Sequence, residues 1–151
     1  MKTSSRLSVA PQTAAVLQRA TASLAPWSLE VHRDPAGTHM GLHVEYLGDD
    51  EAGSLFLLAH YFESLEGWGR SLVPDPEVLL VRAPSGQWVP LAVRTPWGSV
   101  VTAESGDGGV RVVRAAEHRQ LVQMVEAWIE NVERAALVQA ERARAEPNQA
   151  A

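Results

Sequence analysis

The side chains that could take part in catalysis or metal binding lie in the middle of the sequence, at His60, Tyr61, Asp75 and Glu77. An imidazole and two carboxylates can share a cation or exchange a proton, so this polar cluster could form a metal or acid–base site. His60, however, stands in the strongly apolar run 55–62. Histidines in such runs are usually buried and hydrogen-bonded, so we favour a structural role for His60.

The segment Asp75-Pro76-Glu77 also has a structural interpretation. Aspartate hydrogen-bonds nearby backbone groups in turns, and proline suits the first residue of a strand. Pro74-Asp75 resembles the start of a restriction-nuclease-like motif, but that metal chemistry needs a second acid spaced by one residue from a lysine. Lys2 is the only lysine of the chain, so we reject a nuclease.

Two tryptophan–arginine pairs fall in predicted loops beside glycine, namely Trp68 with Arg70 and Trp97 with Arg94. Exposed aromatic–arginine pairs can anchor a partner protein or stack on bases. The alternative is that the two rings cover the ends of the core. The other three tryptophans are expected in the core: Trp27, Trp88 and Trp128.

Length and composition describe a globular protein of one domain. The chain has 151 residues, no cysteine and a formal net charge of −5. We expect loose ends at 1–9 and 145–151 and a single domain over 10–144. No apolar run is long enough to cross a bilayer, and the start lacks the apolar part of a secretory signal, so a cytoplasmic protein is expected. No catalytic residue, metal or cofactor is expected.

Alternating apolar and polar residues predict two half-buried strands early in the chain. In the first, 27–32, Trp27, Leu29 and Val31 are expected to face the core. The run 40–46 alternates in the same way, and the segment DPAG (34–37) between the two runs has the residue types of a turn. Ahead of them, apolar residues at helical spacing behind a proline predict a helix over about 10–24.

The run 54–62 is apolar on both faces, as in a central strand that is covered on both sides. We expect a loop over 63–75 and then strands over 78–82 and 88–93, where Pro90 indicates an edge position or a bulge. SGDGG (105–109) signals a hairpin, 110–113 is the last strand, and a helical stripe runs from Ala115 to about Arg144. The prediction is an α+β fold: an N-terminal helix, an antiparallel meander of about six or seven strands, and a long C-terminal helix packed on the sheet.

With these elements placed, the order of several segments resembles a domain-of-unknown-function family of bacterial integrative elements, plasmids and phages. The family core, AHY followed by a DPE-type segment, corresponds here to Ala59-His60-Tyr61, Leu72 and Asp75-Pro76-Glu77, and its closing helix to Trp128 and Asn131. The resemblance covers roughly 41–135, but ESLEGWGRS (63–71) replaces the family's shorter Glu-Gln-Asn-Gly-Asp turn. It implies a small accessory protein of a mobile element or its relatives, and the family has no established activity to carry over to this chain.

Three functions follow as hypotheses. The first is a non-enzymatic adaptor that contacts a protein partner through the 63–75 loop and the adjoining strand edge. The alanine-rich end of the last helix is either solvated or a homodimer contact. The second is single-stranded nucleic-acid binding on the sheet face, which the acidic balance does not favour. It would need Arg82, Arg94, Arg111 and Arg114 to converge with Trp88 or Trp97. The third is a metal-dependent hydrolase at His60, Asp75 and Glu77.

Overall fold

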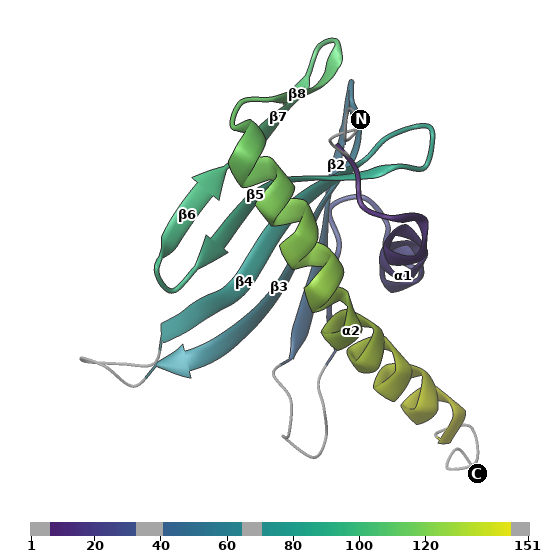
Figure 1. Ribbon diagram of the computed structural model, residues 1–151. Helices are drawn as coiled ribbons and strands as arrows, with labels where there is room; N and C mark the ends of the chain where they lie inside the picture. Colours follow the sequence, from purple (N-terminus) through teal and green to yellow (C-terminus); the bar gives the residue numbers. More distant parts are fainter. Residues whose placement is uncertain (1–6, 33–40, 65–70, 146–151) are drawn as a thin grey trace.

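The computed structural model describes residues 7–32, 41–64 and 71–145, with 131–145 described as helical backbone. Within these ranges the chain forms two helices and eight strands (Figure 1). Their bounds, in chain order, are α1 (Pro11–Thr21), β1 (Leu29–His32), β2 (Leu42–Asp50), β3 (Gly53–Ser64), β4 (Ser71–Arg82), β5 (Trp88–Thr95), β6 (Gly98–Val101), β7 (Ala103–Gly106), β8 (Gly109–Val112) and α2 (Ala115–Ala145).

The first six strands form an antiparallel meander in the order β1-β2-β3-β4-β5-β6, so the predicted α+β fold is confirmed. The predicted hairpin around SGDGG also forms, but β7 and β8 make a two-stranded sheet of their own and do not continue the meander. The change of sheet occurs at Thr102. This buried residue donates its N–H to the carbonyl of Leu91 at 2.8 Å and leaves the β5–β6 ladder there.

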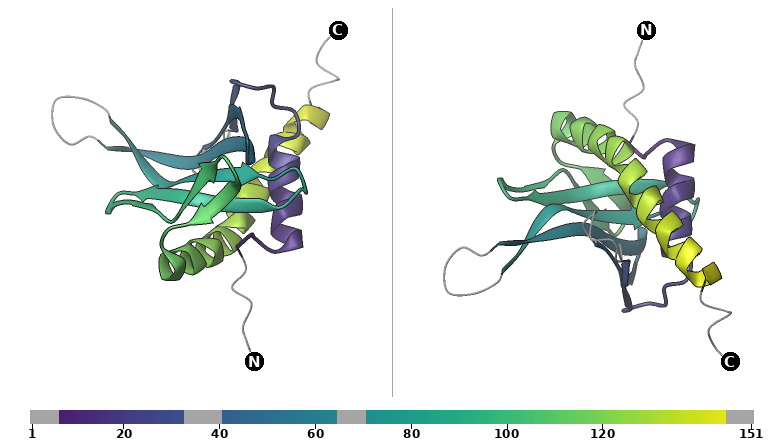
Figure 2. Two further views of the ribbon diagram at one scale, coloured as in Figure 1. Left: turned by 90° about the horizontal axis from the view of Figure 1, so that it is seen from above. Right: turned by 90° about the horizontal axis from the view of Figure 1, so that it is seen from below.

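Both helices pack on the same face of the six-stranded sheet and lie side by side (Figure 2). Alternation along the strands sends every second side chain toward them, and these side chains join the buried stripe of α2 in one core. We call this the helix face of the sheet. The main members of the core between this face and the two helices are Val16, Leu17, Leu42, Val44, Phe56, Leu58, Val78, Leu80, Trp88, Leu121, Val125 and Trp128.

The opposite face, which we call the open face, has only one end covered. There β7 and β8 pack with Val81, Val89 and Leu91 in a second, smaller apolar cluster. The central position predicted for the run 54–62 is confirmed by β3, but the expectation that both faces of this strand are covered is only half right. Leu57, on the open face, remains partly exposed.

The prediction that Trp27 belongs to the core is wrong. Trp27 lies before β1, has a positive φ of 66° and is 80% exposed. The backbone N–H of Trp27 donates to the carbonyl of Tyr46. Its ring lies over Gly48, where a Cβ would come within 2.9 Å of the ring. Leu29, the next residue of the alternating pattern, is exposed as well. The residues around β1 do alternate, but β1 is the edge strand of the sheet, and the apolar side chains of this pattern lie at that edge and on the open face.

Prolines shape β4 and β5. The predicted 63–75 loop is shorter than expected because Ser71 to Pro74 already pair with β3. A register shift between Ala59 and Tyr61 then leaves Asp75 and Pro76 unpaired in this ladder. In β5, the bulge predicted at Pro90 is confirmed. Leu79 pairs with Ala92 and Leu80 with Pro90, which leaves Leu91 unpaired in the ladder.

Helix α2 begins at Ala115 and crosses the sheet, and its last turns extend beyond it (Figure 1). Near its start, the buried His118 hydrogen-bonds Thr102 Oγ1 through Nδ1 at 2.9 Å and the carbonyl of Leu7 through Nε2 at 2.8 Å. These bonds tie the chain ahead of α1 to the helix that closes the fold. Neither helix in the described part of the chain combines the length and hydropathy needed to cross a membrane.

Candidate functional site

His60 lies on the helix face, where strand alternation places it in line with Phe56 and Leu58. It is 6% exposed. The indole Nε1–H of Trp128 donates to its Nδ1 at 3.0 Å, and the two rings meet edge to face with centroids 5.3 Å apart. Because Nδ1 accepts this bond, it carries no proton there. The favoured interpretation of His60 as a buried, hydrogen-bonded histidine is therefore confirmed.

Tyr61 and Glu77 lie on the open face, on neighbouring strands. The Tyr61 hydroxyl donates to Glu77 Oε2 at 2.5 Å, and Arg94 Nη2 donates to the same oxygen at 3.3 Å. The imidazole of His43 packs edge to face against the Tyr61 ring, with the two ring centroids 4.8 Å apart. The structure thus joins a phenol, a carboxylate and a guanidinium in one hydrogen-bonded network across β3, β4 and β5.

The polar cluster predicted from the sequence is therefore divided between the two faces. His60 is buried under α2, Tyr61 and Glu77 are paired on the open face, and the side chain of Asp75 is exposed. Among the described residues, no group of three or more His, Asp or Glu side chains is placed to hold a metal ion. His60, Asp75 and Glu77 do not form one site, so the hydrolase hypothesis has no geometric support.

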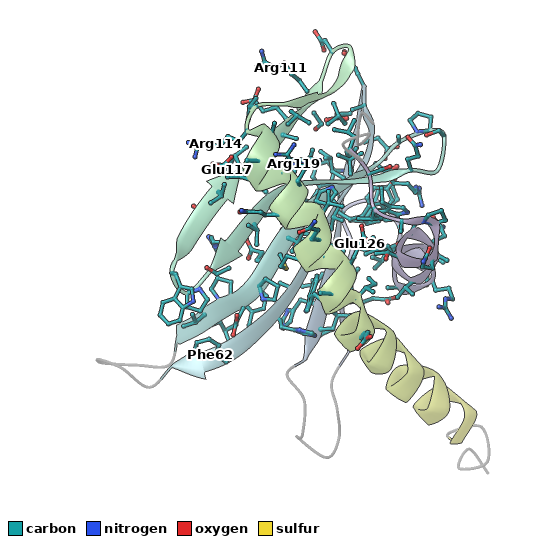
Figure 3. All side chains as sticks on the ribbon, in the orientation of Figure 1. Phe62, Arg111, Arg114, Glu117, Arg119 and Glu126 are labelled. Carbon is teal, nitrogen blue, oxygen red and sulfur yellow. The ribbon has the colours of Figure 1, made fainter. Side chains whose placement is uncertain are left out.

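The arginines named in the nucleic-acid hypothesis do not converge. Arg82 is on the helix face, where its guanidinium lies 5.4 Å from the ring centre of Phe56 and 5.9 Å from that of the buried Trp88. Arg111 pairs with Glu104 at 2.8 Å. Arg111 and Arg114 lie near the start of α2, at the end of the molecule remote from Phe62 (Figure 3). Only Arg94 belongs to the open face.

Trp97 and Arg94, in contrast, are brought together. Trp97 is 93% exposed in the turn between β5 and β6, and both residues line a shallow hollow with Pro74 of β4. Leu72, at the same end of the sheet, is also exposed. Trp68 and Arg70, the other predicted pair, lie outside the described residues.

The strand register arranges the open face in rows that cross the sheet. One row, which we call the apolar row, consists of Leu57, Leu79, Ala92 and Val101, each directly opposite the next. Leu57 is also directly opposite Glu45 of β2, and Glu45 is opposite Leu29 of β1. Leu29 and Val101, at the two ends, are 56% and 51% exposed.

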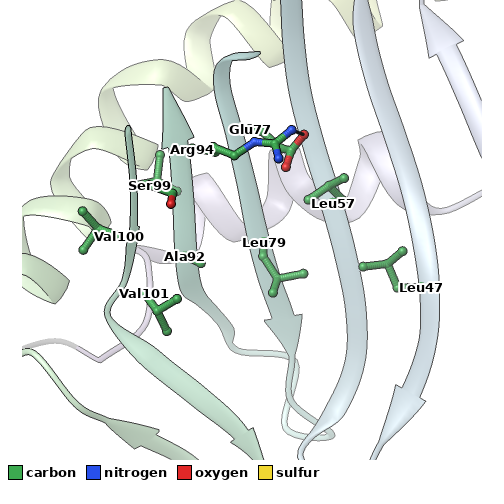
Figure 4. A pocket seen from close by; sticks show the side chains of 10 residues that line it. Leu47, Leu57, Glu77, Leu79, Ala92, Arg94, Ser99, Val100 and Val101 are labelled. Carbon is green, nitrogen blue, oxygen red and sulfur yellow. Dashed lines mark hydrogen bonds and ion pairs between the residues drawn. The ribbon is translucent and has the colours of Figure 1, made fainter. Parts of the chain in front are cut away.

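A second, polar row runs beside the apolar row. It contains Glu77, Arg94 and Ser99, again directly opposite one another. Between and above the two rows, the side chains enclose a hollow of about 310 Å³ whose floor is mainly aliphatic (Figure 4). The open face can therefore receive apolar groups of a ligand at its centre and polar groups at one border.

Sequence reasoning missed the apolar row because its members come from four separate strands. Of the four, only Leu57 belongs to the run 54–62 that was predicted to be covered on both faces. The signal that could have revealed it is the register between strands. The register of the consecutive hairpins, including the bulge at Leu91, makes Leu57, Leu79 and Ala92 neighbours on one face.

The network also changes the acid–base behaviour of Tyr61. Burial raises the pKa of Tyr61 above its ordinary value of 10.0, the hydrogen bond to Glu77 and the charge of that carboxylate raise it further, and Arg94 opposes the shift. In the unfolded chain the phenol ionises at about pH 10. The stability contributed by the neutral phenol is therefore complete below about pH 10 and is lost as the pH rises from there through the folded pKa.

This shift can be measured because the chain has 2 tyrosines, so a Tyr46→Phe protein retains Tyr61 alone. In that protein the ultraviolet absorbance of tyrosinate should appear well above pH ~10. Adding Glu77→Gln removes the negative charge of the carboxylate, which raises the pKa of Tyr61, and should move the titration back toward the ordinary range. Ionisation of Tyr61 at its ordinary pKa in the Glu77 protein would contradict the network.

Comparison with known proteins adds no assignment: no family model, no curated protein and no solved structure matches this chain.

Proposed function

We propose that this protein is a non-enzymatic binding module that holds a protein partner against the open face of its sheet. The observation that carries the proposal is the apolar row, whose four aliphatic side chains stay partly or largely exposed although β7 and β8 cover one end of the open face and Leu79 packs against that smaller cluster. Antiparallel sheets with one solvated face normally carry polar side chains there.

The chemistry of this face suits a protein partner. Contiguous exposed apolar surface on a monomer marks an interaction site, and full burial of each leucine or valine contributes about 1.5–3 kcal/mol. Trp97 lies in the β5–β6 turn, beyond the polar row, and is 93% exposed. It is an aromatic residue, the type that most often supplies the central contacts of an interface. At the border of the apolar row, the Glu77–Arg94 ion pair provides polar groups that a partner can contact while the bond between Glu77 and Arg94 stays intact.

Nucleic acid fits this face less well. Arg94, the arginine that the structure places on it, is already paired with Glu77, and the chain carries a formal net charge of −5. Phosphate binding depends on accumulated positive charge, so a protein partner is the better proposal.

The setting of this function is also a proposal. The resemblance of the segments around Ala59-His60-Tyr61 and Asp75-Pro76-Glu77 to a mobile-element family supports an accessory role in such an element, in the cytoplasm. Genes for integration, replication or transfer beside the gene of this protein are the expected finding. A housekeeping operon in their place would contradict the accessory role and leave the binding face unaffected.

The binding proposal predicts the effect of a charge on the apolar row. Val101→Glu places a carboxylate where an apolar group of the partner would be buried, and should weaken partner binding roughly tenfold or more. The measurement is quantitative affinity capture from the native host, comparing the variant with the wild type. Val113→Glu is the matched control, because Val113 is also exposed and lies outside the row. Equal capture by all three proteins, with equal melting temperatures, would reject the open face as the site.

A further inference from the structure

Glu45 interrupts the apolar surface of the open face. It lies in β2 directly between Leu29 and Leu57, in line with the apolar row. Glu77 accepts hydrogen bonds from Tyr61 and Arg94, whereas Glu45 makes no hydrogen bond or ion pair with any residue in the described ranges. The face therefore carries one carboxylate that is already partnered and one that is available, and the available one is flanked by leucines.

The backbone chemistry of a sheet face restricts what can cover it. Each strand from β2 to β5 has a hydrogen-bonded neighbour on both sides. Apart from the register shifts, their N–H and C=O groups are therefore engaged in the ladders, and the face offers few backbone partners. An extended peptide lying on it would lose its water without gaining hydrogen bonds, which is unfavourable. A helix satisfies its own backbone, and the opposite face of this sheet is covered in that way by α1 and α2.

The dimensions agree with a helix of ordinary length. From Glu45 to Val101 the row crosses five strands, and four spacings of about 4.8 Å give about 19 Å. A helix of roughly 13 residues has this length. An amphipathic helix places apolar side chains along one stripe and polar ones along its borders, which matches an aliphatic row that ends beside a carboxylate.

We propose that the occupant of the open face is an amphipathic helix of a partner protein, with its apolar stripe on the apolar row and a lysine or arginine paired with Glu45. This inference rests on the proposed function and specifies the partner's chemistry. The pairing is complementary in charge, because a carboxylate among leucines gains more from a cation than an exposed one does.

The test uses two synthetic helical peptides of 16 residues that share one leucine stripe and differ in the residues beside it, which are lysine in the first and glutamate in the second. Binding to the full chain is followed by fluorescence anisotropy. The lysine peptide should bind the wild type roughly tenfold more tightly, the effect of one charge-assisted contact. Glu45→Lys should abolish or reverse this preference. Glu130→Lys, the same charge change on the exposed side of α2, should retain it.

If the Glu45→Lys protein prefers the lysine peptide as strongly as the wild type does, the inference is overturned, because the peptide would then respond to net charge alone. If neither peptide binds while Val101→Glu still reduces capture of a host protein, the helix is wrong and the binding face stands. If capture is unaffected too, both proposals fall. A dimer in light scattering that Val101→Glu dissociates would assign the face to a second copy and overturn the inference.

Discussion

Replacing Trp88 by alanine should lower the free energy of unfolding by about 3–5 kcal/mol, the range for removing a large buried aromatic side chain. Trp88 is 1% exposed and sits where the first residue of β5 meets the core. Its ring centroid lies 5.1 Å from that of Phe56, and the guanidinium of Arg82 covers both rings. The cavity left by alanine would remove contacts to an aromatic ring, an aliphatic core and a cation together.

Urea unfolding followed by circular dichroism measures this loss. Trp97→Ala is the matched control, since it removes the same side chain from an exposed turn and should change stability by less than about 0.5 kcal/mol. Similar losses from the two substitutions would mean that Trp88 is not the packing centre of the helix face.

Gly53→Ala should destabilise the protein by about 3 kcal/mol or more, although it adds a single methyl group. Gly53 begins β3 with a φ of 144°, a conformation that side chains disfavour. A Cβ there would lie 2.1 Å from the carbonyl oxygen of Arg82 at the end of β4. Because the obstacle is backbone, the start of β3 or the end of β4 must move.

The control is Gly106→Ala in β7. Its backbone does not require glycine, and a Cβ at this position meets no atom within 4 Å. This variant should unfold at nearly the wild-type urea concentration. A Gly53→Ala protein as stable as the Gly106→Ala protein would show that the β2–β3 turn is not packed against β4 in this way.

The fold class was accessible from the sequence because it depends on local patterns. Alternation marks the strands, glycine and proline mark the turns, and the stripe that includes Leu121, Val125 and Trp128 marks the last helix. Short connections then favour a meander. The burial of His60 was also accessible, because the whole run around it is apolar. Each of these inferences uses residues within one element or its immediate neighbours.

The candidate site was not accessible for the opposite reason. The apolar row joins Leu57, Leu79, Ala92 and Val101 from four strands, and only the register places them in line. A single shift of register, such as the bulge at Leu91, decides whether Ala92 or Val93 faces outward. The prediction that Trp27 lies in the core was wrong for a related reason. The alternating pattern of 27–32 was identified correctly, but nothing local indicates that β1 lies at the edge of the sheet.

The most direct test of the account is photo-crosslinking from the open face in the native host. A photoreactive phenylalanine analogue at Val101 should give a covalent adduct with one partner protein, and the same analogue at the exposed Ala127 of α2 should not. Adding Leu79→Asp to the first protein should remove the adduct while the circular dichroism spectrum stays unchanged. Adducts of equal yield from both positions, or an adduct at Val101 that survives Leu79→Asp, would contradict the assignment of the apolar row as the binding surface.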